Sequence, residues 1–224
     1  MIPAPSTASI RHADLERLLS RERLGSYVGH AGSLDRAIDL YRWNAEAGGA
    51  LWPSIGHVEV ALRNAMSAGL TARHDRLERS GSWLDDPAAE LDPRMRSHIA
   101  AARRRVRKRG KAAVDCQTIS ELGFGFWRFL ITRRHTALWP DLASAFPGAP
   151  DRRRETVEAP VAQLHELRNR IAHHQRIWNR DLAARYADVL LVAGYLDADL
   201  PAWVARSCTV PALLHARPAA PTPR

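Results

Sequence analysis

The sequence predicts an all-α fold in a single domain with a flexible tail at its end. Apolar residues recur three and four positions apart along most of the chain, which is the spacing of one helix face. We find no alternating strand run of useful length and no internal repeat. The 224 residues, 46% hydrophobic and 25% charged, suffice for one substantial core or two small ones. We expect one domain over 1–206 and a flexible, proline-rich tail over 207–224.

The N-terminal half predicts three helices. An amphipathic pattern covers 10–19. A second stripe follows Ser33, a residue type that caps helix N-termini, and we expect Gly48-Gly49 to interrupt it. The strongest helical periodicity of this half then covers 55–70.

The C-terminal half predicts four more helices. Asp92-Pro93 has the residue types of a cap and a first helical position, and the basic helix that follows packs through one narrow apolar stripe as far as Gly110. A helix over 126–131 follows a glycine-containing turn, and 147–150 is the clearest loop. We expect the last long helix to start after Pro160, and a final helix over 181–196.

The positive charge is concentrated in one block. The chain carries a net charge of +9, whereas residues 94–134 hold twelve basic and two acidic residues, so this window alone carries +10. A local excess of this kind favours a polyanionic partner, because each neutralised phosphate releases condensed counterions. The alternative is a solvated helix face. The residues that we expect to bind a polyanion such as RNA are Arg103, Arg104, Arg105, Arg107, Lys108 and Arg109.

The remaining composition excludes several classes of protein. Cys116 and Cys208 form no CxxC pair and cannot build a disulfide framework. No window approaches the roughly 20 apolar residues of a membrane helix, and the first residues lack the pattern of a signal peptide. We expect a cytoplasmic protein without a membrane segment, a metal or a cofactor.

Residues 165–178 concentrate side chains suited to acid–base and phosphate chemistry. At about 100° per residue, His165, Asn169 and His173 form one polar stripe, and the length of Arg168 lets its guanidinium reach that stripe. His165-Glu166 begins like the HExxH zinc motif, but Asn169 occupies the fifth position, so the motif fails.

Metal-free cleavage of RNA fits these residue types. In that reaction a 2′-hydroxyl attacks the adjacent phosphodiester, and the protein moves protons and stabilises added negative charge. Histidine titrates near working pH, and arginine offers a permanently charged, bidentate fork. The residues alone leave an alternative open, in which Arg168 makes a surface ion pair with Glu166 or Glu158 and His173 is an ordinary helix residue.

Four stretches of the chain follow one another in an order that is typical of a known family. They are Tyr41-Arg42-Trp43-Asn44, Val58 to Ala65, Leu122 to Trp127 and Arg168-Asn169-Arg170-Ile171-Ala172-His173. In these stretches the chain resembles the Abi-like (abortive infection, AbiD/AbiF) family of the HEPN superfamily, and the last stretch matches the R-N-x-x-x-H form of its ribonuclease signature. This resemblance covers roughly residues 20 to 205. It implies a HEPN-like helical bundle with flanking helices, metal-independent endoribonuclease activity in phage defence, and a homodimer that pairs two copies of the motif.

The resemblance also implies roles for individual residues. Arg168 and His173 would be the catalytic pair, with Asn169 as a positioning residue. His174 is a candidate contributor outside the minimal motif. Three polar residues on an apolar helix could reach the active-site helix or make buried ion pairs, and we favour the structural role: Glu59, Arg63 and Asn64.

Two other functions remain open at this point. The chain could be a catalytically silent module that binds RNA or an antitoxin, itself RNA or protein. It could also be an interaction protein whose basic block meets an acidic partner. For the tryptophans, including Trp52, we expect packing in the core or an interface, and Trp178 is the one whose contact with RNA we would test.

Overall fold

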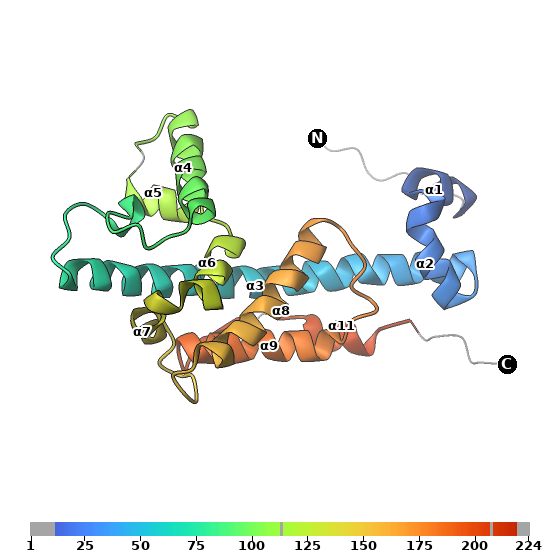
Figure 1. Ribbon diagram of the computed structural model, residues 1–224. Helices are drawn as coiled ribbons and strands as arrows, with labels where there is room; N and C mark the ends of the chain where they lie inside the picture. Colours follow the sequence, from blue (N-terminus) through green and yellow to red (C-terminus); the bar gives the residue numbers. More distant parts are fainter. Residues whose placement is uncertain (1–11, 113, 207, 219–224) are drawn as a thin grey trace, which may run out of the picture.

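The computed structural model describes residues 12–112, 114–206 and 208–218. Over these residues the chain forms helices and no strand, which confirms the all-α class (Figure 1). Three 3₁₀ turns, η1 (Trp83–Asp85), η2 (Arg133–Leu138) and η3 (Ala143–Ala145), join the α-helices. The α-helices are α1 (His12–Leu19), α2 (Arg21–Ala31), α3 (Leu34–Arg76), α4 (Pro93–Lys108), α5 (Asp115–Ser120), α6 (Phe124–Leu130), α7 (Trp139–Leu142), α8 (Arg154–Ala172), α9 (Leu182–Leu196), α10 (Leu200–Ala205) and α11 (Val210–His215).

Helix α3 is the axis of the molecule, and α2, α8, α9 and α11 pack along it (Figure 1). It begins after the predicted Ser33 cap and continues through Gly48-Gly49 and Pro53, so the predicted interruption is wrong. Gly48 is buried, and a Cβ there would lie 3.4 Å from Ile171 Cγ2. The glycine therefore permits close approach of α8, and packing on several helices offsets the propensity cost of about 1 kcal/mol per glycine.

The basic helix α4 agrees with its prediction. Asp92 caps it, because its carboxylate accepts from the backbone N–H of Met95 at 2.9 Å, and Pro93 is its first residue. The predicted apolar stripe is buried, from Met95 at 1% exposure to Val106 at 2%. The arginines consequently cover the other faces, and Gly110 follows the helix with a positive φ of 71°.

Helix α8, which carries the R-N-x-x-x-H string, begins at Arg154, before its predicted start. Pro160 lies inside the helix rather than ahead of it, so that boundary was wrong. Burial explains why the proline is tolerated: Pro160 is buried and neighbours the fully buried Val157 and Val161. The helix predicted over 181–196 is α9, and it begins after Asp181, whose carboxylate caps it by accepting from the backbone N–H of Ala184 at 2.9 Å.

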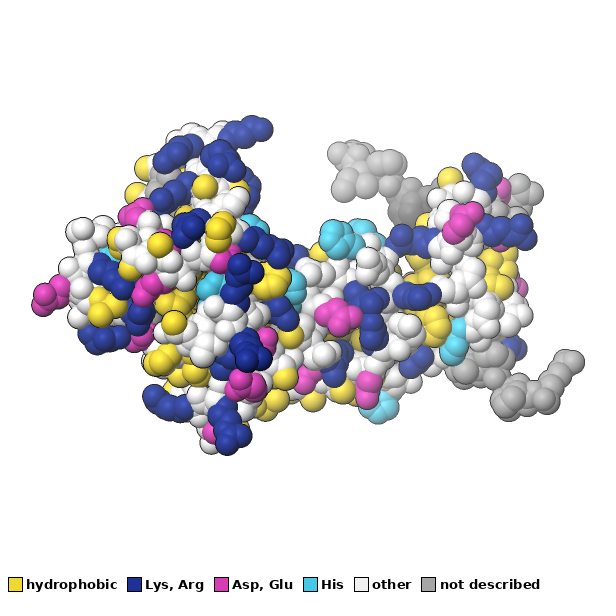
Figure 2. Space-filling model, in the orientation of Figure 1, with side chains coloured by type: hydrophobic (Ala, Val, Ile, Leu, Met, Phe, Trp, Pro, Cys, Tyr) yellow, Lys and Arg dark blue, Asp and Glu magenta, His cyan; other side chains and the backbone are white. Residues whose placement is uncertain are grey.

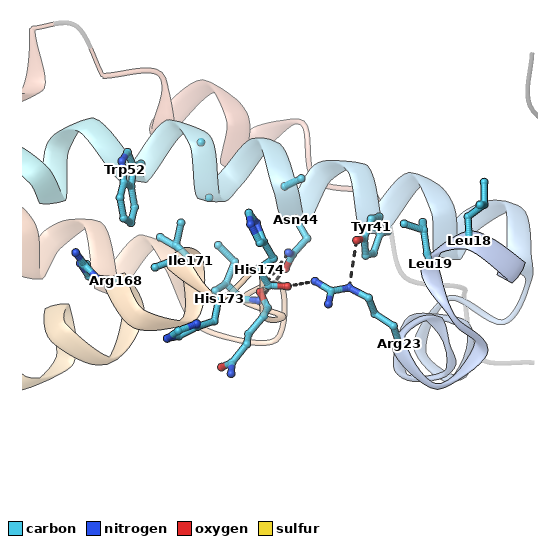
Figure 3. Close-up of a pocket in the computed structure, with 16 residues that line it drawn as sticks. Leu18, Leu19, Arg23, Tyr41, Asn44, Trp52, Arg168, Ile171, His173 and His174 are labelled. Atoms are coloured by element: carbon cyan, nitrogen blue, oxygen red, sulfur yellow. Dashed lines mark hydrogen bonds between the residues drawn. The ribbon is translucent and has the colours of Figure 1, made fainter. Parts of the chain in front are cut away.

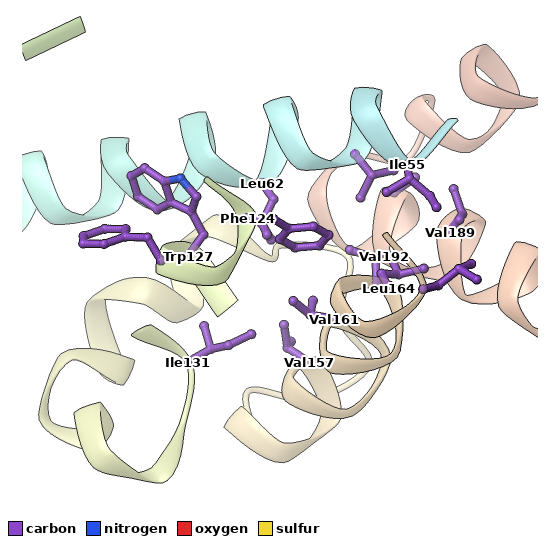
Figure 4. Close-up of a cluster of buried hydrophobic side chains, with 14 of the residues drawn as sticks. Ile55, Leu62, Phe124, Trp127, Ile131, Val157, Val161, Leu164, Val189 and Val192 are labelled. Carbon is purple, nitrogen blue, oxygen red and sulfur yellow. The ribbon is translucent and has the colours of Figure 1, made fainter. Parts of the chain in front are cut away.

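The core lies where α3, α6, α8 and α9 meet (Figure 4). Branched aliphatic side chains from α8 and α9 face the central part of α3, while the aromatic rings of α6 cover its next turns (Figure 4). This packing fixes α8 against α3, which matters for the site below. Its members include Ile55, Leu62, Phe124, Trp127, Val161, Leu164, Val189 and Val192, each at most 2% exposed.

The predicted flexible tail needs a correction. Residues 210–215 form α11, whose Val210 is 1% exposed and whose Leu213 carbonyl accepts from Trp43 Nε1 at 3.0 Å. Val210, Leu213 and Leu214 pack in or against the hydrophobic core, whereas the prediction of a flexible tail considered only the number of prolines. Residues 207 and 219–224 of that tail lie outside the described residues. Within the described part, no helix combines the length and apolar content that crossing a membrane requires.

Candidate active site

A groove of about 1040 Å³ lies between the α1–α2 pair, the first half of α3 and the C-terminal end of α8. Figure 2 shows the surface hollowed between the middle of the molecule and the lobe that α1 and α2 form. Apolar and small residues make up most of the lining. Its polar side chains are Arg23, Tyr41, Asn44, Arg168, His173, His174 and Gln175, and none of the described lining residues is Asp or Glu.

The R-N-x-x-x-H string divides between two hollows on either side of α8. Arg168 lines the groove, whereas Asn169 lines a second hollow of about 410 Å³ together with His165 and Arg128. His173 lines both hollows, because it is the capping residue at the end of α8. Its ring is exposed, so it is accessible from either side.

The guanidinium of Arg168 is hydrogen-bonded through Nε only. Its Nε lies 3.4 Å from Glu59 Oε2 on α3, and its guanidinium carbon lies 5.4 Å from the centre of the Trp52 ring (Figure 3 shows Trp52 and Arg168). Within the described residues, its two terminal nitrogens have no hydrogen-bond partner. The side chain is 30% exposed. The fork of N–H donors therefore remains available to an anion, while Glu59 and Trp52 restrict its position.

Asn169 contacts His165, a member of the predicted polar stripe to which the resemblance assigns no role. Its Nδ2 lies 3.1 Å from His165 Nε2, so the amide donates to an unprotonated ring nitrogen. Burial lowers the pKa of His165, and the charges of Arg128 and Arg168 lower it further. The ring lies against α6, where a Cβ on Gly125 would be 3.1 Å from Nε2. The sequence signal for this contact was the spacing of four residues between His165 and Asn169, which places both side chains on one face of the helix.

The loop that follows His173 is fastened to α3 by Asn44. Asn44 is 7% exposed, and its Oδ1 accepts from the backbone N–H groups of Ile177 at 2.7 Å and Trp178 at 3.0 Å. His174 begins this loop with a φ of +51°, a strained conformation for a non-glycine residue. Its carbonyl accepts from Arg23, as the dashed line in Figure 3 marks. The loop geometry thus links α2, α3 and the end of α8.

The other predicted contributors occupy different places. Glu59 reaches the active-site helix through Arg168, as described above. Arg63 reaches the Ser120 carbonyl at 3.5 Å, and Asn64 is exposed, so neither lines the groove. The alternative partners of Arg168 are both engaged elsewhere. Glu166 pairs with Arg170 and Arg180, and Glu158 pairs with Arg154.

The basic residues of α4 fall into two sets. Arg103, Arg105 and Arg109 make ion pairs, the first with Asp85 and the other two with Glu121. In contrast, Arg104, Arg107 and Lys108 are exposed and have no ion-pair partner among the described residues. Intramolecular acids therefore neutralise half of the predicted RNA-binding set. The unpaired half remains available to an external anion.

The tryptophans differ from expectation at the two positions that concern the groove. Trp52 is 43% exposed and lines the groove, so its ring is not part of the core. Trp178 is 8% exposed, and its ring packs on His30 at 4.4 Å and on Tyr27 at 5.7 Å between ring centres. Trp52, rather than Trp178, is therefore the tryptophan placed to touch a ligand at this site.

Comparison with family models, curated proteins and solved structures finds no match for the chain. Among the described residues, no group of three or more His, Cys, Asp and Glu side chains is arranged to hold a metal ion. The function is therefore inferred from the geometry of the groove and from the motif resemblance.

Proposed function

We propose that the chain is a metal-independent endoribonuclease that uses Arg168 and His173 on RNA bound at the groove. One observation carries the proposal: a guanidinium anchored through Nε, with its fork free, shares a groove with an exposed imidazole at the end of the same helix. These two groups supply what cleavage by a 2′-hydroxyl requires, namely anion stabilisation and proton transfer.

The proposed reaction is a transesterification within the RNA. The 2′-oxygen bonds to the adjacent phosphorus as the bond between phosphorus and the 5′-oxygen breaks. Arg168 donates to the phosphate oxygens, whose charge rises in the pentavalent transition state. His173 either takes the proton of the 2′-hydroxyl or gives one to the departing 5′-oxygen. The products are a 2′,3′-cyclic phosphate, which water can open to a 3′-phosphate, and a 5′-hydroxyl.

The surroundings of the pair support this assignment of roles. Glu59 and Trp52 orient the Arg168 guanidinium, and Asn169 is oriented in turn by the neutral ring of His165. A second proton-transfer group would come from a second copy of the motif, so the proposal includes a homodimer. The unpaired residues of α4 would guide the RNA by its phosphates. The resemblance adds a role in phage defence. The composition adds a cytoplasmic location, and an RNA or a protein antitoxin is a candidate partner.

The nature of the nucleophile provides the test. An RNA oligonucleotide is mapped for cleavage sites in EDTA, and the ribose on the 5′ side of the main site is then replaced by 2′-deoxyribose. We expect cleavage at that site to disappear, while neighbouring sites are still cut and their products carry 5′-hydroxyl ends. Continued cleavage at the deoxy position would contradict 2′-hydroxyl attack. Salt-sensitive RNA binding without any cleavage would instead favour the silent binding module.

A further inference from the structure

The groove combines an apolar interior with a cationic edge. Its apolar walls come from Leu18 and Leu19 on α1 and from Ile171 on α8, while Arg23, Arg168 and two histidines supply the polar edge. Since none of the described lining residues is acidic, the groove complements an occupant that has both an apolar part and a negative charge. Its volume of about 1040 Å³ lies at the upper end of the range of about 300–1,000 Å³ that is usual for ligand sites.

The shape of the groove favours a flat apolar group. The α3 surface that borders it carries Ala45, Gly48 and Gly49, so no large side chain projects from these positions. One turn further along α3, the Trp52 ring is 43% exposed and has the Arg168 guanidinium 5.4 Å from its centre. In Figure 3, Trp52 extends from α3 toward the helix that carries Arg168. The Arg168 guanidinium covers one face of the ring, so a planar ring that stacks on the remaining exposed indole surface would carry an attached anion beside the arginine.

We infer that the groove binds an unpaired nucleobase of the RNA by stacking on Trp52, beside the phosphate held at Arg168 and His173. This inference rests on the proposed function and specifies its substrate as single-stranded at the bound base. A nucleotide joins a planar apolar ring to a negative phosphate, which is the combination that the groove presents. In a duplex both faces of the base are already stacked, so duplex RNA would bind through its phosphates alone.

The experiment measures binding by fluorescence anisotropy with a short labelled single-stranded RNA whose riboses are all 2′-O-methylated. This modification blocks the nucleophile, so binding is measured whether or not the protein is a nuclease. A second strand carries abasic residues throughout and keeps every phosphate, and a third is the first strand annealed to its complement. We expect the first strand to bind more tightly than the other two.

The protein variants separate stacking from simple occupation of the groove. Trp52→Ala is expected to weaken binding of the first strand by roughly 5- to 150-fold, the range that corresponds to stacking of one base. Trp52→Phe retains an aromatic ring and should restore most of the affinity, whereas Trp52→Leu should not. Trp203→Ala is the matched control, because Trp203 is 51% exposed on α10 and lies outside the groove. Trp203→Ala should leave binding of every strand unchanged, whereas Trp52→Ala and Trp52→Leu should weaken binding of the intact strand more than binding of the abasic strand, because only the intact strand loses a stacked base.

Three results would overturn the inference. Equal affinity of the intact and abasic strands for the wild type would do so, and so would full affinity of Trp52→Ala, since either means that phosphates alone are recognised. Saturable binding of laurate in place of the RNA would also contradict it and would identify a site for fatty acids. Stacking-dependent binding without cleavage of unmodified RNA would refute the nuclease proposal and leave the base site standing.

Discussion

Replacing Asn44 by alanine should destabilise the protein more than any change of an exposed polar residue on α3. Asn44 Oδ1 accepts from two backbone N–H groups, those of Ile177 and Trp178, and these residues are 1% and 8% exposed. An alanine leaves both donors buried without a partner. Each unsatisfied donor costs about 1–3 kcal/mol, so for two donors we expect a loss of about 2–6 kcal/mol in the free energy of unfolding.

The measurement is urea denaturation of the two proteins, supported by thermal unfolding. For a chain of this size the loss corresponds to a fall in Tm of roughly 4 to 24 °C. Asn64→Ala is the matched control, because Asn64 has the same chemistry on the same helix but is exposed. It should change stability by no more than about 0.5 kcal/mol.

One outcome of this comparison would contradict the prediction. If Asn44→Ala and Asn64→Ala have equal stabilities, the loop after His173 is not held by Asn44. Loss of stability should also be accompanied by loss of RNA cleavage at temperatures where Asn44→Ala is still folded, because the same loop begins at the capping residue of α8.

Three further changes test the charges of the structure. Since the pKa of His165 is lowered on folding, the unfolded chain takes up a proton first, and wild-type stability should fall as pH drops below about 6.5. His165→Gln should remove this part of the pH dependence of stability. Identical pH profiles of the two proteins would refute the argument that burial lowers the pKa of His165. The pKa of Glu90 falls to about 2 through hydrogen bonds from two arginines, so its contribution is full above about 4.5 and lost toward pH 2. Glu90→Gln should cost about 1–2 kcal/mol at pH 7, after allowance for solvent screening, and nothing at pH 2. Changing Arg104, Arg107 and Lys108 to glutamine should reduce the salt dependence of single-stranded RNA binding by about two units of log K against log salt, and an unchanged slope would exclude them as phosphate contacts.

Local signals predicted the helices whose ends depend on local chemistry. Ser33, Asp92 and Asp181 cap helices as their residue types indicate, because a cap is an interaction between neighbours in the chain. The helix boundaries predicted at Gly48-Gly49 and at Pro160 were wrong, because they depend on contacts that are not local. Gly48 packs against Ile171, which is distant in sequence, and Pro160 is buried inside α8, so that packing outweighs the intrinsic preference of glycine and proline.

For the candidate site, the sequence indicated residue types but not the partners of those residues in the fold. The spacing of Arg168 and His173 placed both near one end of a helix, but the choice of Glu59 over Glu158 or Glu166 depends on how α3 crosses α8. The basic helix illustrates the same limit. Its charge count could not reveal that Glu121 would pair with two of its arginines, since pairing depends on the fold.

The proposed nuclease activity depends on two side chains, and cleavage of RNA in EDTA by wild type, Arg168→Ala and His173→Ala tests it. His215→Ala serves as the control, because His215 is an exposed histidine on α11 that lines neither hollow. We predict that wild type and His215→Ala cleave equally, while each of the other two variants is slower by at least about 100-fold, the effect of losing one transition-state donor. Undiminished cleavage by Arg168→Ala and His173→Ala would contradict the assignment and place the activity elsewhere.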